Sequence, residues 1–172
     1  PEGVIENWLA EHTFKTMDRW YGNLRLVTYA VPPAAAAETL TSVDAVFGDS
    51  IQLRGYGLFP SQPVPDSTLQ LTLEWEAYAP IEARYKVFAQ LLDDGHQIVG
   101  QNDSEPSGGN KPTNAWLAGE TVLDRRGIPI PAATPAGDYT LLVGLYDEAT
   151  GVRLPVQVQG SPAGDALPLT TV

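Results

Sequence analysis

The stretch from position 68 to position 77 alternates strictly between apolar and polar residues. Its odd positions hold leucine, tryptophan or alanine, and its even positions hold threonine, glutamine or glutamate. Because successive side chains of a β-strand point to opposite faces, this alternation predicts a strand with one buried face and one solvated face. Such a strand belongs to an antiparallel sheet that packs one face on a core. The predicted inward residues are Leu69, Leu71, Leu73, Trp75 and Ala77.

Other stretches with strand character follow at short intervals, separated by turns rich in glycine, proline and aspartate. In one of them, Ile51, Leu53 and Gly55 are expected on the same face. The turn that ends in Tyr139 resembles the tyrosine corner of immunoglobulin-like domains, where the tyrosine hydroxyl holds the preceding loop. We therefore predict an all-β fold: a two-sheet antiparallel β-sandwich of immunoglobulin-like form, with a jelly roll as the alternative. The other expected strands are 24–31, 51–58, 85–92, 96–101, 120–130, 138–146, 152–158 and 167–172.

The N-terminal part of the chain has a different character. Residues 3–12 suit a short helix with an apolar stripe, and we expect Trp8 and Trp20 to dock this segment onto the sandwich. The strand at 24–31 is expected to be partly covered on both faces. Two prolines at 32–33 and the alanines at 34–37 mark a boundary. We therefore divide the chain into an N-terminal unit, 1–42, and a β-sandwich domain, 43–172.

The charge and composition exclude several classes of partner and chemistry. The chain of 172 residues carries a formal charge of −11, so nucleic acid is not an expected partner, because its phosphates would be repelled. An anionic membrane surface is disfavoured for the same reason. Without cysteine there is no disulfide, zinc–thiolate site or thiol nucleophile. Since the chain starts at Pro1 and its only methionine is Met17, we expect it to be a piece of a longer protein.

No residue is predicted to be catalytic. His12 ends the expected helix and His96 lies in an expected turn, and neither has an evident group to orient it as a general base. The serines lie in turns or loops, and none stands in a Gly-x-Ser-x-Gly elbow. Glu74 and Glu76 have a spacing that any two residues on one strand face share. A solvated strand face explains this carboxylate pair.

A group of carboxylates near the expected hairpin at residues 93–105 is the candidate metal site. Loop carboxylates together with backbone carbonyls are ligands that calcium prefers. The spacing matches no EF-hand loop, and ordinary turn chemistry is the alternative explanation. The candidate ligands of a calcium ion are Asp93, Asp94, Asp103 and Glu105.

The expected loop at 102–119 is the candidate ligand-binding feature. Loops of this length in compact domains are usually functional or disordered. It ends near Trp116, whose indole could stack on a sugar ring, with Tyr56 and Tyr78 as further platforms. The alternative is that Trp116 closes one end of the hydrophobic core.

Several stretches taken together resemble one known family, namely residues 8–12, 19–26, 47–56, 69–75, 85–93, 112–116, 119–120 and 137–147. They are similar to the C-terminal soluble domain that follows the membrane region of bacterial, Chloroflexi-type, multi-spanning glycosyltransferases. Those enzymes are related to the dolichyl-phosphate-mannose protein mannosyltransferases and the lipid A aminoarabinose transferases. These enzymes use a polyprenyl-phosphate sugar donor. The resemblance implies that their catalytic carboxylates belong to a membrane portion that is absent from this chain.

The resemblance implies an accessory role for the chain. We expect a non-catalytic, extracytoplasmic β-sandwich beside a membrane active site. Its expected partner is the membrane-embedded catalytic portion of the same polypeptide, and a glycan or acceptor is a further candidate. A carbohydrate-binding module and a structural or adhesive surface domain are the alternatives. No cofactor is expected apart from the calcium ion considered above.

Overall fold

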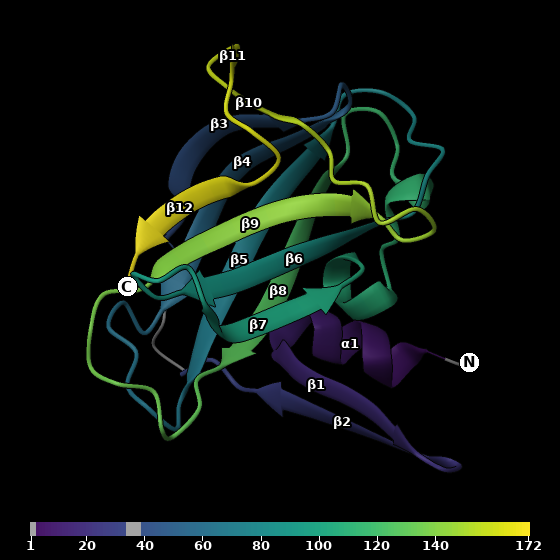
Figure 1. The fold of residues 1–172 in the computed structure, drawn as a ribbon. Coiled ribbons are helices and arrows are strands. Elements are labelled where there is room, and N and C mark those ends of the chain that lie inside the picture. The colour runs from purple at the N-terminus through teal and green to yellow at the C-terminus, as the bar shows by residue number, and fades with distance from the viewer. Residues whose placement is uncertain (1–2, 34–38) are drawn as a thin grey trace.

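The computed structural model describes residues 3–33 and 39–172. Within these residues the chain forms an all-β sandwich, in which an eight-stranded sheet packs against a four-stranded sheet (Figure 1). One α-helix and two short 3₁₀ helices complete the elements of the described part. The two sheets and the short N-terminal helix confirm the predicted fold class.

The larger sheet contains both N-terminal strands and the central strands of the sandwich. Its order is β11-β10-β3-β4-β5-β8-β1-β2. Neighbouring strands are antiparallel except β1 and β8, which meet in parallel where Lys15 lies opposite Arg126. The strands are β1 (Phe14–Tyr21), β2 (Leu24–Ala30), β3 (Thr41–Phe47), β4 (Ile51–Phe59), β5 (Thr68–Ala77), β8 (Thr121–Pro129), β10 (Val156–Val158) and β11 (Ser161–Pro162).

The smaller sheet is antiparallel throughout, with the order β12-β9-β6-β7. Its strands are β6 (Tyr85–Leu92), β7 (Ile98–Ser104), β9 (Thr140–Asp147) and β12 (Leu167–Thr171). The predicted loop at 102–119 starts later than expected, because β7 continues to Ser104, and it contains the 3₁₀ helices η1 (Pro106–Gly109) and η2 (Thr113–Ala115). The strand expected at 152–158 is shorter and is represented by β10.

The core lies between the two sheets, and β5 crosses it. All five residues predicted to point inward from β5 are fully buried. The ring of Trp75 meets that of Phe47 edge-on, with 5.4 Å between centroids. This inward face is confirmed.

The opposite face of β5 differs from the prediction, because it is covered rather than solvated. Gln70 and Thr72 are buried on this face, and Glu74 and Glu76 are half-buried. The segment that leaves β2 reaches over this face, and the side-chain amide of Gln70 donates a hydrogen bond to the carbonyl of Val31 at 3.4 Å. Alternation in a sequence shows which residues are polar, but it does not show what lies over them.

A β-bulge changes the face on which the second half of β4 presents its side chains. The register between β4 and β5 shifts between Leu53 and Gly55. As a result Tyr56 and Leu58 follow Leu53 on the core side, whereas Gly55 lies near Glu74 on the outer face. The expected continuation of the inward face through Gly55 is therefore wrong.

The N-terminal elements form an extension of the larger sheet. The helix α1 (Val4–His12) forms as predicted, but none of its residues is buried. Trp8 is 56% exposed and Trp20 is 64% exposed, so neither indole docks this segment onto the sandwich as expected. Strand β2 is at the edge of the sheet, and its first residues, from Leu24, are exposed on both faces. The prediction that both faces are partly covered fails there because, among the described elements, β2 packs mainly against β1, and no layer lies over its first residues.

Two further expectations concern the ends of the sandwich. The hydroxyl of Tyr139 donates a hydrogen bond to the carbonyl of Pro135 at 2.7 Å, which confirms the predicted tyrosine corner. The expected boundary at 42/43 falls within β3, and the alanines at 34–37 lie outside the described residues.

Candidate functional site

The structure places the predicted sugar-stacking tryptophan in the core. Trp116 is only 3% exposed, and its indole N–H donates a hydrogen bond to the carbonyl of Lys111 at 2.9 Å. Glu120 accepts a hydrogen bond from the backbone N–H of Leu117 and forms an ion pair with Lys111. The loop around the indole is therefore held by contacts between its own residues. These interactions lower the pKa of Glu120, the backbone hydrogen bond contributing most. Trp116 therefore closes the core, as the alternative held, and cannot stack on a sugar.

The two tyrosines predicted as further platforms lie on opposite faces of the larger sheet. Tyr56 points toward the core and is partly buried against it. Tyr78 is on the outer side, where its hydroxyl donates a hydrogen bond to the side-chain oxygen of Gln52. Burial, with a smaller contribution from Glu76, raises the pKa of Tyr78. The structure does not bring Trp116, Tyr56 and Tyr78 together.

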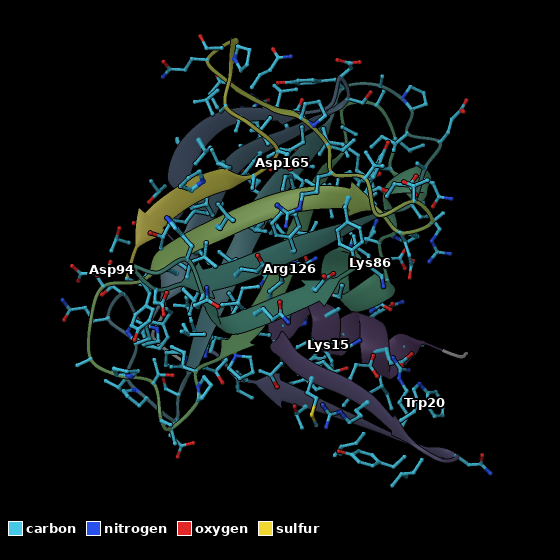
Figure 2. The ribbon with its side chains drawn as sticks, viewed as in Figure 1. Lys15, Trp20, Lys86, Asp94, Arg126 and Asp165 are labelled. Atoms are coloured by element: carbon cyan, nitrogen blue, oxygen red, sulfur yellow. The ribbon has the colours of Figure 1, made fainter. Side chains whose placement is uncertain are left out.

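The four candidate calcium ligands are also separated. Asp93 and Asp94 lie at the turn between β6 and β7, and Asp103 lies at the far end of β7, opposite Phe88. Asp103 lies five residue steps along β7 from Ile98, which corresponds to roughly 17 Å. Figure 2 shows Asp94 at one end of the small sheet, far from Lys86 near the start of β6. Asp103 lies at the Lys86 end, because it is paired with Phe88.

Three of the four carboxylates make hydrogen bonds within the fold. Asp93 accepts a hydrogen bond from the backbone N–H of Gln97 at 2.8 Å, Asp103 accepts one from the hydroxyl of Tyr146 at 2.9 Å, and Glu105 receives two from Arg84 at 2.6 and 2.5 Å. Within the described part of the chain, no group of three or more histidine, aspartate or glutamate side chains is placed to hold a metal ion. The predicted metal cluster is wrong because its members belong to opposite ends of one hairpin.

The histidines and the glutamate pair have structural contacts. The Nδ1 atom of His12 bonds the carbonyl of Trp8 at 2.8 Å, and the two rings stack with 4.6 Å between centroids. His96 adopts a positive φ of 59° in the β6–β7 turn. Glu76 pairs with Arg54 at 2.6 Å across the outer face of the sheet. None of these contacts arranges an acid and a base around a common point.

A buried ion pair that was not predicted joins the two sheets. Arg126 and Asp124 are both almost completely buried on β8, and Nε of Arg126 lies 2.7 Å from Oδ2 of Asp124. The Arg126 guanidinium also donates to the carbonyl of Val87 on β6 at 2.9 Å and to the carbonyl of Ser104 on β7 at 2.9 Å. The second oxygen of Asp124 accepts the backbone N–H of Ser107 at 2.8 Å. Their contacts link β8 to β6, β7 and η1, and removing one partner of such a buried pair is strongly destabilising.

The same network holds the N-terminal strand. Asn102 accepts a hydrogen bond from Arg126 at 3.2 Å, and its amide donates to the carbonyls of Lys15 and Gly127, each at 2.9 Å. The ammonium of Lys15 donates to the carbonyl of Gly108 at 3.1 Å. Strand β1 is thus attached to the sandwich by specific polar contacts.

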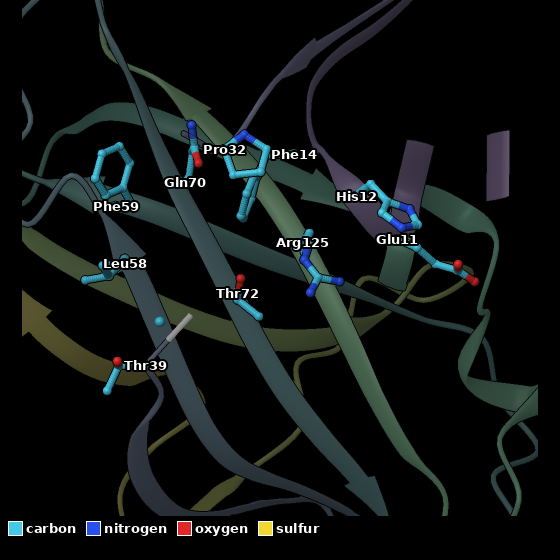
Figure 3. A pocket seen from close by; sticks show the side chains of 11 residues that line it. Glu11, His12, Phe14, Pro32, Thr39, Leu58, Phe59, Gln70, Thr72 and Arg125 are labelled. Carbon is cyan, nitrogen blue, oxygen red and sulfur yellow. The ribbon is translucent and has the colours of Figure 1, made fainter. Parts of the chain in front are cut away.

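A pocket of about 270 Å³ lies on the outer face of the larger sheet, between the end of α1 and strands β4, β5 and β8. Figure 3 shows Arg125 and Thr72 in its middle, with His12 at one end and Phe59 at the other. The lining also includes Gln70, whose side-chain oxygen has no hydrogen-bond partner among the described residues. The pocket is therefore mixed in character, with an apolar end and a polar end.

Exposed apolar side chains are concentrated at the N-terminal elements. Of the fifteen large apolar side chains that are exposed among the described residues, eight lie in residues 3–33. Seven of these are on α1 and on the hairpin formed by β1 and β2. We call this set the N-terminal apolar surface; it consists of Val4, Ile5, Trp8, Trp20, Tyr21, Leu24 and Leu26.

An ion-pair network connects α1 to the hairpin and fixes their relative position. Arg25 on β2 contacts Glu6 on α1 at 2.8 Å and Asp18 on β1 at 2.8 Å. Asp18 also pairs with Lys15 at 2.5 Å. The hydrogen bonds from Arg25 hold the pKa of the Asp18 carboxyl well below its usual range. The first turn of α1 and the hairpin tip consequently lie at the same end of the molecule (Figure 1).

Sequence reasoning missed both the buried ion pair and the exposed surface. The ion pair had a signal: Val122, Asp124, Arg126 and Ile128 occupy alternate positions and therefore share one face of a strand. The exposed surface had none, since an apolar stripe and two tryptophans are equally typical of a docked segment.

Comparisons with known proteins add no relative. No family model matches the chain, and no curated protein sequence matches it either. No helix in residues 3–33 or 39–172 has the length and apolar character required to cross a bilayer.

Proposed function

We propose that this chain is a non-catalytic accessory domain of a membrane glycosyltransferase, located on the extracytoplasmic side of the membrane. Its N-terminal apolar surface is the part that faces the membrane and the membrane-embedded catalytic portion of the same polypeptide. The sequence resemblance described above supports the family. The exposed apolar side chains on α1 and the β1–β2 hairpin support the mode of attachment.

The observation that carries this proposal is the concentration of exposed apolar groups at one end of an acidic molecule. Apolar side chains gathered on the surface of a soluble domain mark protein–protein or membrane interaction sites. Trp and Tyr are also the residues most enriched at such sites. The two indoles of this surface are more than half exposed, whereas Trp75 and Trp116 are buried. The chain therefore has apolar material that its own core does not use.

The attachment of the hairpin to the sandwich suits a docking role. Strand β1 is held by Asn102 and Gly108 through the backbone of Lys15 and its ammonium group. The first turn of α1 is held through the pair formed by Glu6 and Arg25. These contacts give the surface a defined orientation relative to the sheets, which an accessory domain needs in order to stand in a fixed place beside an active site.

The most direct test is the coding sequence upstream of Pro1. The proposal predicts several runs of about 20 apolar residues there, each long enough to cross a bilayer. A soluble domain directly upstream of Pro1, with no such runs, would overturn it. A second test assays the purified chain for glycosyl transfer and for glycoside hydrolysis. We expect neither, and either activity in the isolated chain would contradict the non-catalytic role.

A further inference from the structure

The tip of the β1–β2 hairpin has a composition unlike the rest of the chain. Tyr21 and Leu24 are paired next to the turn, and Trp20 and Arg25 form the next pair. Trp20, Tyr21 and Leu24 are all more than half exposed. We infer that this tip inserts into the lipid–water interface of a bilayer, with Trp20, Tyr21 and Leu24 as the inserted groups. The inference rests on the proposed membrane location of the chain.

The directions of the side chains favour lipid over a protein surface. Residues paired across a hairpin share a face, and neighbours along a strand point to opposite faces. Tyr21 and Leu24 therefore project from one face, and Trp20 projects from the other. A flat protein partner would cover only one face and leave the apolar side chain on the other face in water. A lipid interface surrounds the tip and covers both.

The charge distribution favours the same occupant. The chain as a whole carries −11, yet no aspartate or glutamate occurs between positions 19 and 37. Positions 14–33 hold three basic residues and one acidic residue, which gives a local charge of +2. The one acidic residue of the hairpin, Asp18, and the neighbouring Glu6 are both paired with Arg25, and Arg19 is exposed beside Trp20. Arginine at this position can bind phosphate groups while the apolar side chains enter the interface.

The residue types also fit the interface and limit the depth of insertion. Trp and Tyr have an apolar ring and one polar group, and they are enriched where a bilayer meets water. Arg25, which is paired with Trp20, contacts Asp18 and Glu6, and this charged group restricts insertion to the turn end of the hairpin. On α1, Val4 and Ile5 lie beside Glu6 and add apolar surface near this charged group. The geometry therefore predicts shallow insertion of the tip.

The test measures partitioning of the full chain into phosphatidylcholine vesicles by flotation. We expect the wild-type chain to float with the vesicles and the Trp20→Ala/Leu24→Ser variant to partition at least about tenfold less, because it loses most of the inserted apolar area. Leu117→Ser is the matched control: Leu117 is 72% exposed and Leu24 is 68% exposed, so this variant should partition as the wild-type chain does. Thermal unfolding of each variant verifies that the fold is intact.

Three outcomes contradict the inference: no flotation of the wild-type chain, equal flotation of the hairpin variant, and an equal loss in the Leu117 variant. Should the hairpin variant unfold, the emission of Trp20 in a Trp8→Phe background provides a second measurement. A blue shift on adding vesicles supports insertion, and an unchanged spectrum contradicts it. Failure here leaves the proposed function intact if the upstream sequence contains membrane spans, because the tip would then meet protein. Absence of those spans removes the proposed function whatever the vesicle result.

Discussion

The interior of the sandwich and the tip of the β1–β2 hairpin treat charge and apolar surface in opposite ways. Between the sheets, Arg126 and Asp124 are withdrawn from water but surrounded by partners on three strands and η1. At the hairpin tip, Trp20 and Leu24 are left in water without a core to cover them. The comparison teaches that burial by itself does not identify a functional residue. The interior pair is satisfied within the chain, and the tip is not.

The largest expected effect comes from disrupting the buried ion pair between Arg126 and Asp124. Replacing Arg126 by Ala removes five hydrogen-bond contacts and leaves the Asp124 carboxylate buried without its partner, so we expect a loss of about 3–5 kcal/mol in the free energy of unfolding. Denaturant titration measures this loss. The control is Arg54→Ala, whose side chain is about half exposed where it pairs with Glu76, and it should lose less than about 1 kcal/mol. Similar losses for the two variants would show that the network does not stabilise the packing of the sheets.

Two tryptophans provide the sharpest matched pair. Trp75→Ala creates a cavity in the core and should reduce the free energy of unfolding by about 3–5 kcal/mol. Trp20→Ala changes an exposed tip and should alter it by no more than about 0.5 kcal/mol in either direction. Both values come from denaturant titration of the chain in the absence of lipid. A large loss for Trp20→Ala would mean that the indole supports the fold, and the tip would then lose its role as a free interaction surface.

The tyrosine corner allows a smaller test. Tyr139→Phe removes only the hydroxyl that bonds Pro135 at 2.7 Å, so we expect a loss of about 1 kcal/mol in the free energy of unfolding. The matched control is Tyr21→Phe at the exposed tip, where the same change should have no measurable effect. If both variants are equally stable, the corner contributes no net stability.

The positions of the strands and the inward residues of β5 could be predicted from the sequence. The elements that pack over each face of a strand could not. The bounds expected for β6, 85–92, match the observed strand, and the inward face of β5 is as predicted. The outer face of β5 is buried because residues before position 33 reach across it, which is a contact between distant parts of the chain. The bulge after Leu53 had no signal other than glycine, and it reversed the side on which Tyr56 points.

The candidate site residues failed for a related reason. Asp93 and Asp103 are ten positions apart. Asp93 lies at the turn of the β6–β7 hairpin, and Asp103 lies at its open end. Trp116 is followed by Leu117, which is exposed, so the loop buries one large apolar side chain and releases the next. Strand β1 was missed because Lys15, Asp18 and Arg19 interrupt the apolar pattern of an edge ribbon. Whether residues form one site depends on the distances between elements in the fold. The sequence pattern does not contain these distances.

The smallest expected effect is the pH dependence of the stability that the Asp18–Arg25 pair contributes. Because the hydrogen bonds from Arg25 lower the pKa of Asp18 in the folded chain, this carboxylate contributes stability above its unfolded pKa of about 3.9 and loses it as the pH falls below that value. Asp18→Asn should therefore be less stable than the wild-type chain by up to about 1 kcal/mol near neutral pH, with the difference shrinking toward pH 3. Denaturant titrations at several pH values measure it. A difference that grows on acidification would contradict the pairing with Arg25.

The central claim, that the N-terminal apolar surface faces a membrane, is tested most directly by the depth of Trp20 in a bilayer. In a Trp8→Phe variant, Trp20 is the one exposed tryptophan, since Trp75 and Trp116 are buried. Phosphatidylcholines brominated at different depths quench tryptophan emission by contact. We predict that bromine near the headgroup end of the acyl chains quenches this variant most strongly, and that Trp20→Phe abolishes the effect. No quenching at any depth, or quenching that persists after Trp20→Phe, would contradict the claim.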